Sequence, residues 1–88
     1  MAIWRDDIDA LAFRPAGHDG FCMVHRLALR TVIGRLAAPE ECLEYFAANQ
    51  PVFEAAALDK IARAGLASDA NFHLTSRDIT GQSGAISG

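Results

Sequence analysis

The stretch Pro39 to Gly65, PEECLEYFAANQPVFEAAALDKIARAG, decides the fold of this 88-residue chain. Its apolar residues recur at spacings of three and four, which predicts one apolar face on a long helix. That face comprises Leu43, Phe46, Gln50, Phe53, Ala57 and Ile61. Pro39 suits the first helical position, and Gly65 suits the left-handed residue after the last turn. We expect the rest of the chain to pack against this helix.

Pro51 interrupts the helical pattern. A proline inside a helix removes a backbone hydrogen bond and crowds the carbonyl of Ala47, at a cost of about 3 kcal/mol. The chain could form one helix that kinks at Pro51, or two abutting helices with Gln50 as a poor cap and Pro51 at the first position of the second. Because the apolar face keeps its phase from Phe46 to Phe53, the sequence favours the kinked helix.

Two strands are predicted before the long helix. Residues 10–14 form the first, with Leu11 and Phe13 on one face, and Pro15 ends it because proline cannot donate to a strand ladder. Residues 16–20 have the composition of a turn, so a second strand over 21–27 completes a hairpin. In that strand Phe21, Met23, His25 and Leu27 alternate with Cys22, Val24 and Arg26. We expect the first set to face the helices, which would leave His25 buried or half-buried.

The remaining elements are shorter. Apolar residues at Leu29, Val32, Ile33 and Leu36 predict a short helix over about 28–36, with Gly34 inside it. The alternation of side chains over residues 71–78 predicts a third strand with one solvent-exposed face. Trp4 is expected to lie in an irregular arm with its indole folded onto the domain edge. Residues 80–88, TGQSGAISG, are Gly/Ser-rich and are expected to form a disordered tail.

These elements predict the α+β class. The expected architecture is a compact ββααβ domain over residues 1–79, in which a three-stranded, mainly antiparallel sheet packs on one short helix and one long helix kinked at Pro51.

The composition of the chain excludes several classes of function. The formal net charge of −3 argues against a dedicated nucleic-acid protein, because phosphate contacts need a concentrated positive field. Hydrophobic residues make up 51% of the chain but aromatic residues only 8%, so the core is thin and a homodimer interface would relieve the shortage. No apolar run is long enough for a membrane span, and the acidic N-terminus does not resemble a signal peptide. We expect a cytoplasmic protein in which Cys22 and Cys42 are buried, reduced thiols.

Several segments of the sequence resemble the small bacterial proteins of the domain of unknown function 1488. The resemblance covers about Trp4 to Ile79 and rests on the N-terminal Trp and four segments: ALAF, HRLALRTVIGRL, FAANQPVFEAAALDKI and FHLTSRDI. Pro51 departs from the helix pattern of that family, and Ala28 stands where members often carry a Ser cap. The resemblance implies a compact ββααβ domain with no established activity, and it transfers no functional residue.

Motifs for catalysis are weak. His18-Asp19 resembles half of a phosphohydrolase metal pair, but no distant His or Asp cluster accompanies it. Cys22 and His25 are three apart on a strand, so they point to opposite faces and cannot bind one ion together. Ser83 lies in a sequence close to G-x-S-x-G, but Ala85 replaces the last glycine and no strand precedes it. We therefore expect no enzyme activity, no catalytic residue, no metal and no cofactor.

One basic cluster remains. Arg26, Arg30 and Arg35 lie in a stretch without acidic residues, and they could form an anion or nucleic-acid patch or pair with the glutamates at 40, 41 and 44. The sequence favours a non-enzymatic interaction or accessory module that self-associates, with an unidentified protein partner. The alternative is a weak nucleic-acid or anion-binding domain that uses the three arginines.

Overall fold

The computed structural model describes the backbone of residues 2–87 and the side chains of residues 2–81. The protein is an α+β domain with a four-stranded mixed sheet and four helices. In chain order the elements are β1 (Ala2–Arg5), β2 (Ala10–Phe13), β3 (Cys22–His25), α1 (Arg26–Ile33), α2 (Pro39–Ala48), α3 (Gln50–Ala64), β4 (Phe72–Leu74) and α4 (Ser76–Ser87). The radius of gyration is 12.1 Å, which matches the value of about 12 Å for a compact domain of this length.

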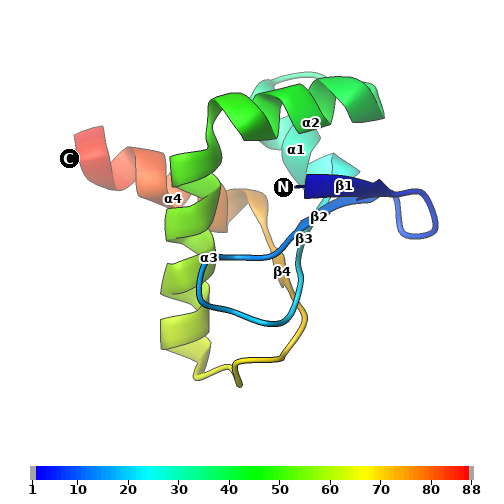
Figure 1. Cartoon of the computed structure of the whole chain (residues 1–88). Helices are drawn as coiled ribbons and strands as arrows, with labels where there is room; N and C mark the ends of the chain where they lie inside the picture. Colours follow the sequence, from blue (N-terminus) through cyan, green and yellow to red (C-terminus); the bar gives the residue numbers. More distant parts are fainter. Residues whose placement is uncertain (1, 88) are drawn as a thin grey trace.

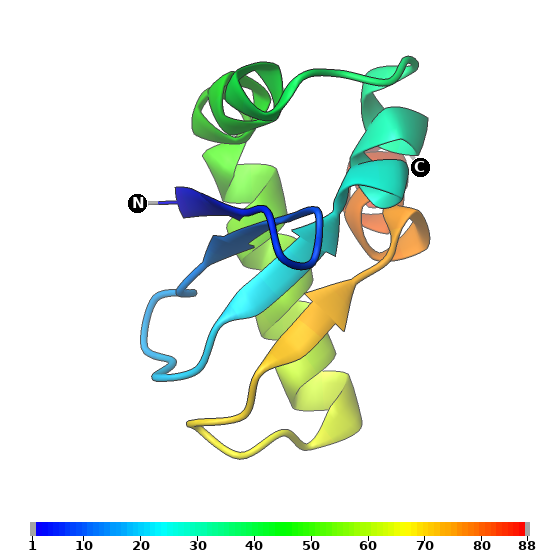
Figure 2. The same ribbon diagram turned by 90° about the vertical axis from the view of Figure 1, so that its right-hand side faces the viewer.

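The sheet follows the order β1-β2-β3-β4 (Figure 2). β1, β2 and β3 form an antiparallel meander, in which Trp4 pairs with Leu11 and Leu11 with Val24. β4 joins β3 in parallel, with Leu74 beside Val24. A parallel pair needs a crossover connection, and here α1, α2 and α3 supply it.

The main core lies between one face of the sheet and the helices (Figure 1). Leu11 and Phe13 of β2 meet Phe46 of α2 and Phe53 of α3 there. The rings of Phe13 and Phe46 are 4.8 Å apart between centroids, and those of Phe46 and Phe53 are 5.2 Å apart. Aromatic pairs at such distances contribute beyond the area they bury, so this cluster anchors both helices to the sheet. The expectation that the long helical stretch supports the domain is confirmed.

The strand count differs from the expectation of three. Residues 2–5 form β1 instead of an irregular arm, and Trp4 is half-buried against the core. Four residues that flank an acidic turn are too few to show a clear alternation, so the sequence pattern did not reveal the strand. The predicted hairpin of the next two strands is confirmed as β2 and β3.

The expected orientation of the second strand was wrong. Cys22 and Val24 face the helices, and His25 is exposed. Alternation fixes which residues share a face but leaves open which face is covered. The register decides it, because Cys22 and Val24 pair with Phe13 and Leu11, whose side chains fill the core. His25 instead caps α1, its Nδ1 accepting a hydrogen bond from the backbone N–H of Leu27 at 3.2 Å.

The expected single kinked helix is two helices. α2 ends and α3 begins around Asn49, whose φ of −123° and ψ of 24° are not helical. The backbone N–H of Asn49 and its side-chain amide both donate to the carbonyl of Tyr45, at 3.0 and 2.9 Å. Pro51 lies in the first turn of α3, where its missing N–H is not needed. The two helices meet at a sharp corner (Figure 1), and Gln50 is exposed rather than on the shared apolar face.

Other boundaries also shift. α1 ends at Ile33 because Gly34, expected inside the helix, takes the left-handed conformation at φ 97° and donates its N–H to the carbonyl of Arg30. Gly65 ends α3 in the left-handed conformation, as expected. The predicted third strand is shortened to β4 because α4 starts at Ser76. The segment expected to form a tail from residue 80 continues this helix as far as Ser87, and Gly88 lies outside the described residues.

Candidate functional site

The three candidate arginines do not share one unpaired patch. Arg26 is half-buried, and its Nε donates to the carbonyl of Ala37 at 3.0 Å while its Nη1 lies 3.8 Å from Asp9 Oδ1. Arg35 forms an ion pair with Glu41. Arg30 is exposed and forms no ion pair within the part of the chain that the structure describes. Arg26 and Arg35 therefore already bind groups of the same chain.

The Arg35–Glu41 pair also stabilises the start of α2. Glu41 Oε1 accepts a hydrogen bond from the backbone N–H of Ala38 at 3.0 Å, as in one half of a capping box. The hydrogen bond from Arg35, together with that backbone N–H, lowers the pKa of Glu41 to about 2. Of the two alternatives for the arginine stretch, pairing with the nearby glutamates is confirmed for Arg35.

His18 and Asp19 hold a loop in place. His18 is 5% exposed, its Nε2 lies 2.7 Å from the carbonyl oxygen of Ala70, and its ring packs edge-on against Phe72. The backbone N–H of Asp19 donates to the carbonyl of Ser68 at 2.7 Å. These contacts fasten the loop between β2 and β3 to the segment that leads into β4. Among the residues that the structure describes, no three His, Cys, Asp or Glu side chains are grouped as metal ligands.

The two cysteines are buried and unpaired. Burial raises the pKa of both thiols, and most strongly that of Cys22. A buried thiol with a raised pKa is a poor nucleophile, because the thiolate is the reactive form. Cys22 faces the core whereas His25 is exposed, so the expectation that they point to opposite faces is confirmed. The side chain of Ser83, the remaining nucleophile candidate, lies outside the described residues.

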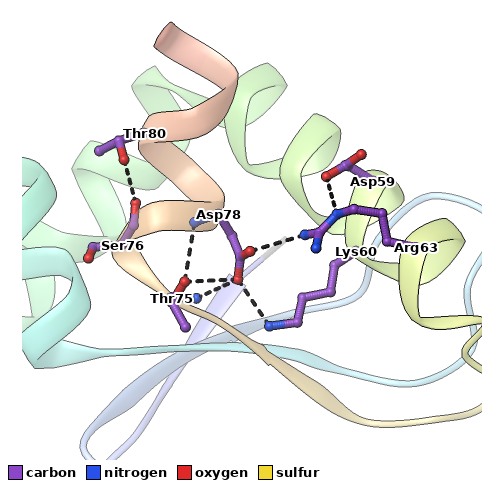
Figure 3. A network of polar contacts seen from close by, with 7 residues as sticks. All are labelled: Asp59, Lys60, Arg63, Thr75, Ser76, Asp78 and Thr80. Atoms are coloured by element: carbon purple, nitrogen blue, oxygen red, sulfur yellow. Dashed lines mark hydrogen bonds and ion pairs between the residues drawn. The ribbon is translucent and has the colours of Figure 1, made fainter. Parts of the chain in front are cut away.

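A polar network around Asp78 attaches α4 to α3 (Figure 3). Asp78 Oδ2 accepts hydrogen bonds from Lys60 Nζ at 3.0 Å and from the backbone N–H of Thr75 at 2.8 Å, and Oδ1 accepts one from Arg63 Nη2 at 3.1 Å. Arg63 also donates its Nε to Asp59 at 2.7 Å. In return, Thr75 Oγ1 accepts a hydrogen bond from the backbone N–H of Asp78 at 3.2 Å. This reciprocal pair is a capping box at the start of α4.

The network keeps Asp78 ionised. Partial burial raises the pKa of this carboxyl, but the hydrogen bonds from Thr75 and Lys60 outweigh the burial, and the pKa lies below its ordinary value. Both carboxylate oxygens accept hydrogen bonds from the protein, so the geometry serves the attachment of α4 to α3. Sequence reasoning missed this cluster. Thr75 followed three residues later by Asp78 is a helix-start pattern that could have revealed it.

The opposite face of the sheet is not covered by any helix or strand of residues 2–87, as Figures 1 and 2 both show. We call it the open face, and it consists of Ile3, Arg5, Ala10, Ala12, Met23, His25 and His73. Ile3, Ala12, Met23 and His73 form one row across the four strands, because each pairs with the next.

Long side chains close much of the open face. Ala10, Ala12 and Met23 form a small cluster with half-buried Phe21 at its edge. The guanidinium of Arg14 lies 5.0 Å above the Phe21 ring, in a cation–π arrangement. Ile3 remains 49% exposed at one end of the row. The open face is therefore a partly closed apolar surface with basic side chains around it.

Comparisons of the chain with protein-family models, curated proteins and solved structures found no match. The resemblance to the domain of unknown function 1488 therefore stays a prediction. Within the described residues, no helix is both long and apolar enough to cross a membrane.

Proposed function

We propose that the protein is a small non-enzymatic interaction module that self-associates through the open face. One observation carries the proposal: the helices of residues 2–87 pack on one face of the sheet, and the exposed side chain of Ile3 continues the apolar row formed by Ala12 and Met23 on the other. The side chain of Ile3, which remains 49% exposed to water at the end of this row, is stabilised when a second surface covers it.

The size of the open face limits the strength of this association. Four strands spaced about 4.8 Å apart, each about four residues long, give roughly 250 Å² of flat sheet. Two such faces bury far less than the roughly 1,200–2,000 Å² of a stable protein–protein interface. The proposed association is therefore weak and concentration-dependent, with a dissociation constant of about 10 µM or higher.

The charged groups at the open face are already partly compensated, which lowers the cost of covering them. Arg5 forms a two-point ion pair with Asp7, and Arg14 lies over Phe21. A guanidinium that keeps a carboxylate or an aromatic ring beside it loses less on desolvation than a free one.

The anion-binding alternative has less support. Of its three arginines, Arg26 is engaged by Ala37 and Arg35 by Glu41, which leaves Arg30. One exposed arginine supplies about one phosphate contact, too few for useful affinity at physiological salt. The proposed cytoplasmic location and bacterial origin rest on composition and on the family resemblance.

Sedimentation analysis over a concentration series tests the proposal. The wild type is expected to shift from monomer towards dimer between about 10 µM and 1 mM. Ile3→Glu places a charge at the end of the apolar row and should keep the protein monomeric. Because Ile3 is half-exposed, this variant should retain its fold.

Leu58→Glu is the matched control. Leu58 lies on α3, is also 49% exposed, and is remote from the open face. It should associate like the wild type. A wild type that stays monomeric at 1 mM, or a dimer that Leu58→Glu disrupts as strongly as Ile3→Glu, contradicts the proposal.

A further inference from the structure

A pocket of about 260 Å³ lies beside the corner where α2 meets α3. Its lining comes from all four helices and comprises Val32, Tyr45, Asn49, Val52, Phe53, Ile79 and Thr80. The corner is a direct result of the break around Asn49, which brings the last turn of α2 and the first turn of α3 to one side. The pocket is separate from the open face, because its lining residues belong to the helical layer.

The lining determines the charge of a ligand. Among the described side chains, no Asp, Glu, Lys or Arg contributes to it, and its accessible apolar side chains include those of Val32, Tyr45 and Val52. A charged ligand would lose its hydration in this pocket without gaining a partner, which is costly. A neutral ligand with a large apolar surface avoids that cost.

The volume of the pocket limits the size of the ligand. An apolar cavity of about 150 Å³ is sufficient to hold benzene. A pocket of 260 Å³ therefore has room for a fused two-ring molecule and is too small for a nucleotide or a cofactor. The half-buried ring of Tyr45 is held perpendicular to the buried ring of Phe53, with centroids 6.1 Å apart, and it can pack against an aromatic guest.

The polar groups of the pocket lining determine how a bound ligand is oriented. Asn49 uses its Nδ2 to donate to the carbonyl of Tyr45, so its Oδ1 is an acceptor that forms no hydrogen bond with a described residue. The hydroxyl of Thr80 donates to the carbonyl of Ser76. The fixed acceptor at Asn49 favours a ligand that carries an N–H or O–H donor.

We propose that the pocket between the α2–α3 corner, α1 and α4 binds a small neutral two-ring aromatic molecule with one N–H donor, of the indole class. The ring system fills the apolar part between Val32, Tyr45 and Val52, and its N–H donates to Asn49 Oδ1. A ligand of this size makes few contacts, so the dissociation constant is about 0.1–1 mM.

Two probes that differ in one group test the proposal on the full chain. Indole and indene have nearly the same shape, but indene lacks the N–H. Titrations followed by amide chemical shifts should show saturable changes around the pocket for both, with indole binding about five- to tenfold more tightly because of its one hydrogen bond. Asn49→Ala should remove this difference by weakening indole alone.

Val52→Phe fills the pocket and should abolish the binding of both probes. Leu58→Phe introduces the same phenyl ring on an exposed part of α3 outside the pocket and should leave both affinities unchanged. Circular dichroism shows whether each variant is folded, and the indole-to-indene ratio in the wild type needs no variant at all. No saturable shifts below 5 mM, equal affinities for the two probes, or binding that survives Val52→Phe would overturn the proposal.

Discussion

Leu11 and Ala12 are neighbours in β2 and point to opposite faces of the sheet, yet they are 0% and 1% exposed. Leu11 is covered by helices, in the cluster that contains Phe46 and Phe53. Ala12 has no described element above it, and longer side chains on adjacent strands, including Met23, close over its methyl group. Equal burial therefore arises in two ways. A small residue in the middle of an open sheet is shielded by its neighbours, so burial alone does not identify the face that a helix covers.

The two faces should differ in what they contribute. The covered face holds the large side chains, and apolar area removed from water is the main favourable term in folding. The open face buries small side chains and one methionine. We expect the first to carry most of the stability and the second to be available for binding.

The largest expected effect is on the covered face. Phe53 is fully buried among three other aromatic rings, those of Phe13, Tyr45 and Phe46. Phe53→Ala should lower the free energy of unfolding by about 3–5 kcal/mol, through lost transfer energy and the cavity left behind. Urea denaturation followed by circular dichroism measures this loss. An unchanged denaturation midpoint would show that packing of the helices on the sheet contributes little to stability.

The second effect concerns the polar attachment of α4 on the covered side. Asp78→Ala removes hydrogen bonds to Lys60, Arg63 and Thr75 and should cost about 2–3 kcal/mol at pH 7. Because the folded-state pKa of Asp78 is lowered, its contribution is present above its unfolded pKa of about 3.9 and is lost as the pH falls through the folded value.

Denaturation at several pH values tests this dependence. The gap between wild type and variant should be constant from pH 7 to about pH 5 and should narrow below about pH 4. A gap that stays the same at pH 3 would mean that the charge of Asp78 is not what attaches α4.

The third effect is on the open face. Met23 is 9% exposed, and Met23→Ala should cost about 1–2 kcal/mol, less than a typical core truncation, because neighbouring side chains can collapse into the space. The same urea titration gives the value. A loss as large as that of Phe53→Ala would remove the distinction between the two faces.

The smallest effect concerns the corner between the two covering helices. Pro51 is exposed in the first turn of α3, where its fixed φ restricts the unfolded chain and costs the helix no hydrogen bond. Pro51→Ala should therefore lower stability by about 0.4–1 kcal/mol. A gain in stability, measured by thermal melting, would indicate that the helices tend to fuse into one.

The sequence predicted the α+β class, the β2–β3 hairpin and the core role of Phe46 and Phe53, because these depend on local periodicity and on long apolar side chains. It did not predict which face of β3 is covered, since alternation is symmetric and the covered face depends on pairing with Leu11 and Phe13. It also favoured a continuous helix through Pro51. The continuous apolar face favours one helix, but a proline inside a helix costs more than that face gains. The chain therefore breaks into two helices at Asn49, whose backbone is not helical.

The candidate sites were predicted less well than the fold. Proximity in sequence suggested that Arg26, Arg30 and Arg35 act together, but their guanidinium groups have different partners, such as Ala37 and Glu41, and these depend on the tertiary fold. The pocket beside Asn49 was not predictable from one segment, because its lining is assembled from all four helices.

The parallel pairing of β4 with β3 affects the order of folding. The connection between these strands, residues 26–71, is roughly six times longer than the loop 14–21 that joins β2 to β3, and closing it costs about 1.5 kcal/mol more in chain entropy. The meander and helices can form while the C-terminus is still being synthesised, so β4 and α4 are expected to join last. Until they do, the backbone edge of β3 from Cys22 to Val24 is unpaired, and a nascent chain that pauses near residue 70 would present it to other chains as an aggregation site.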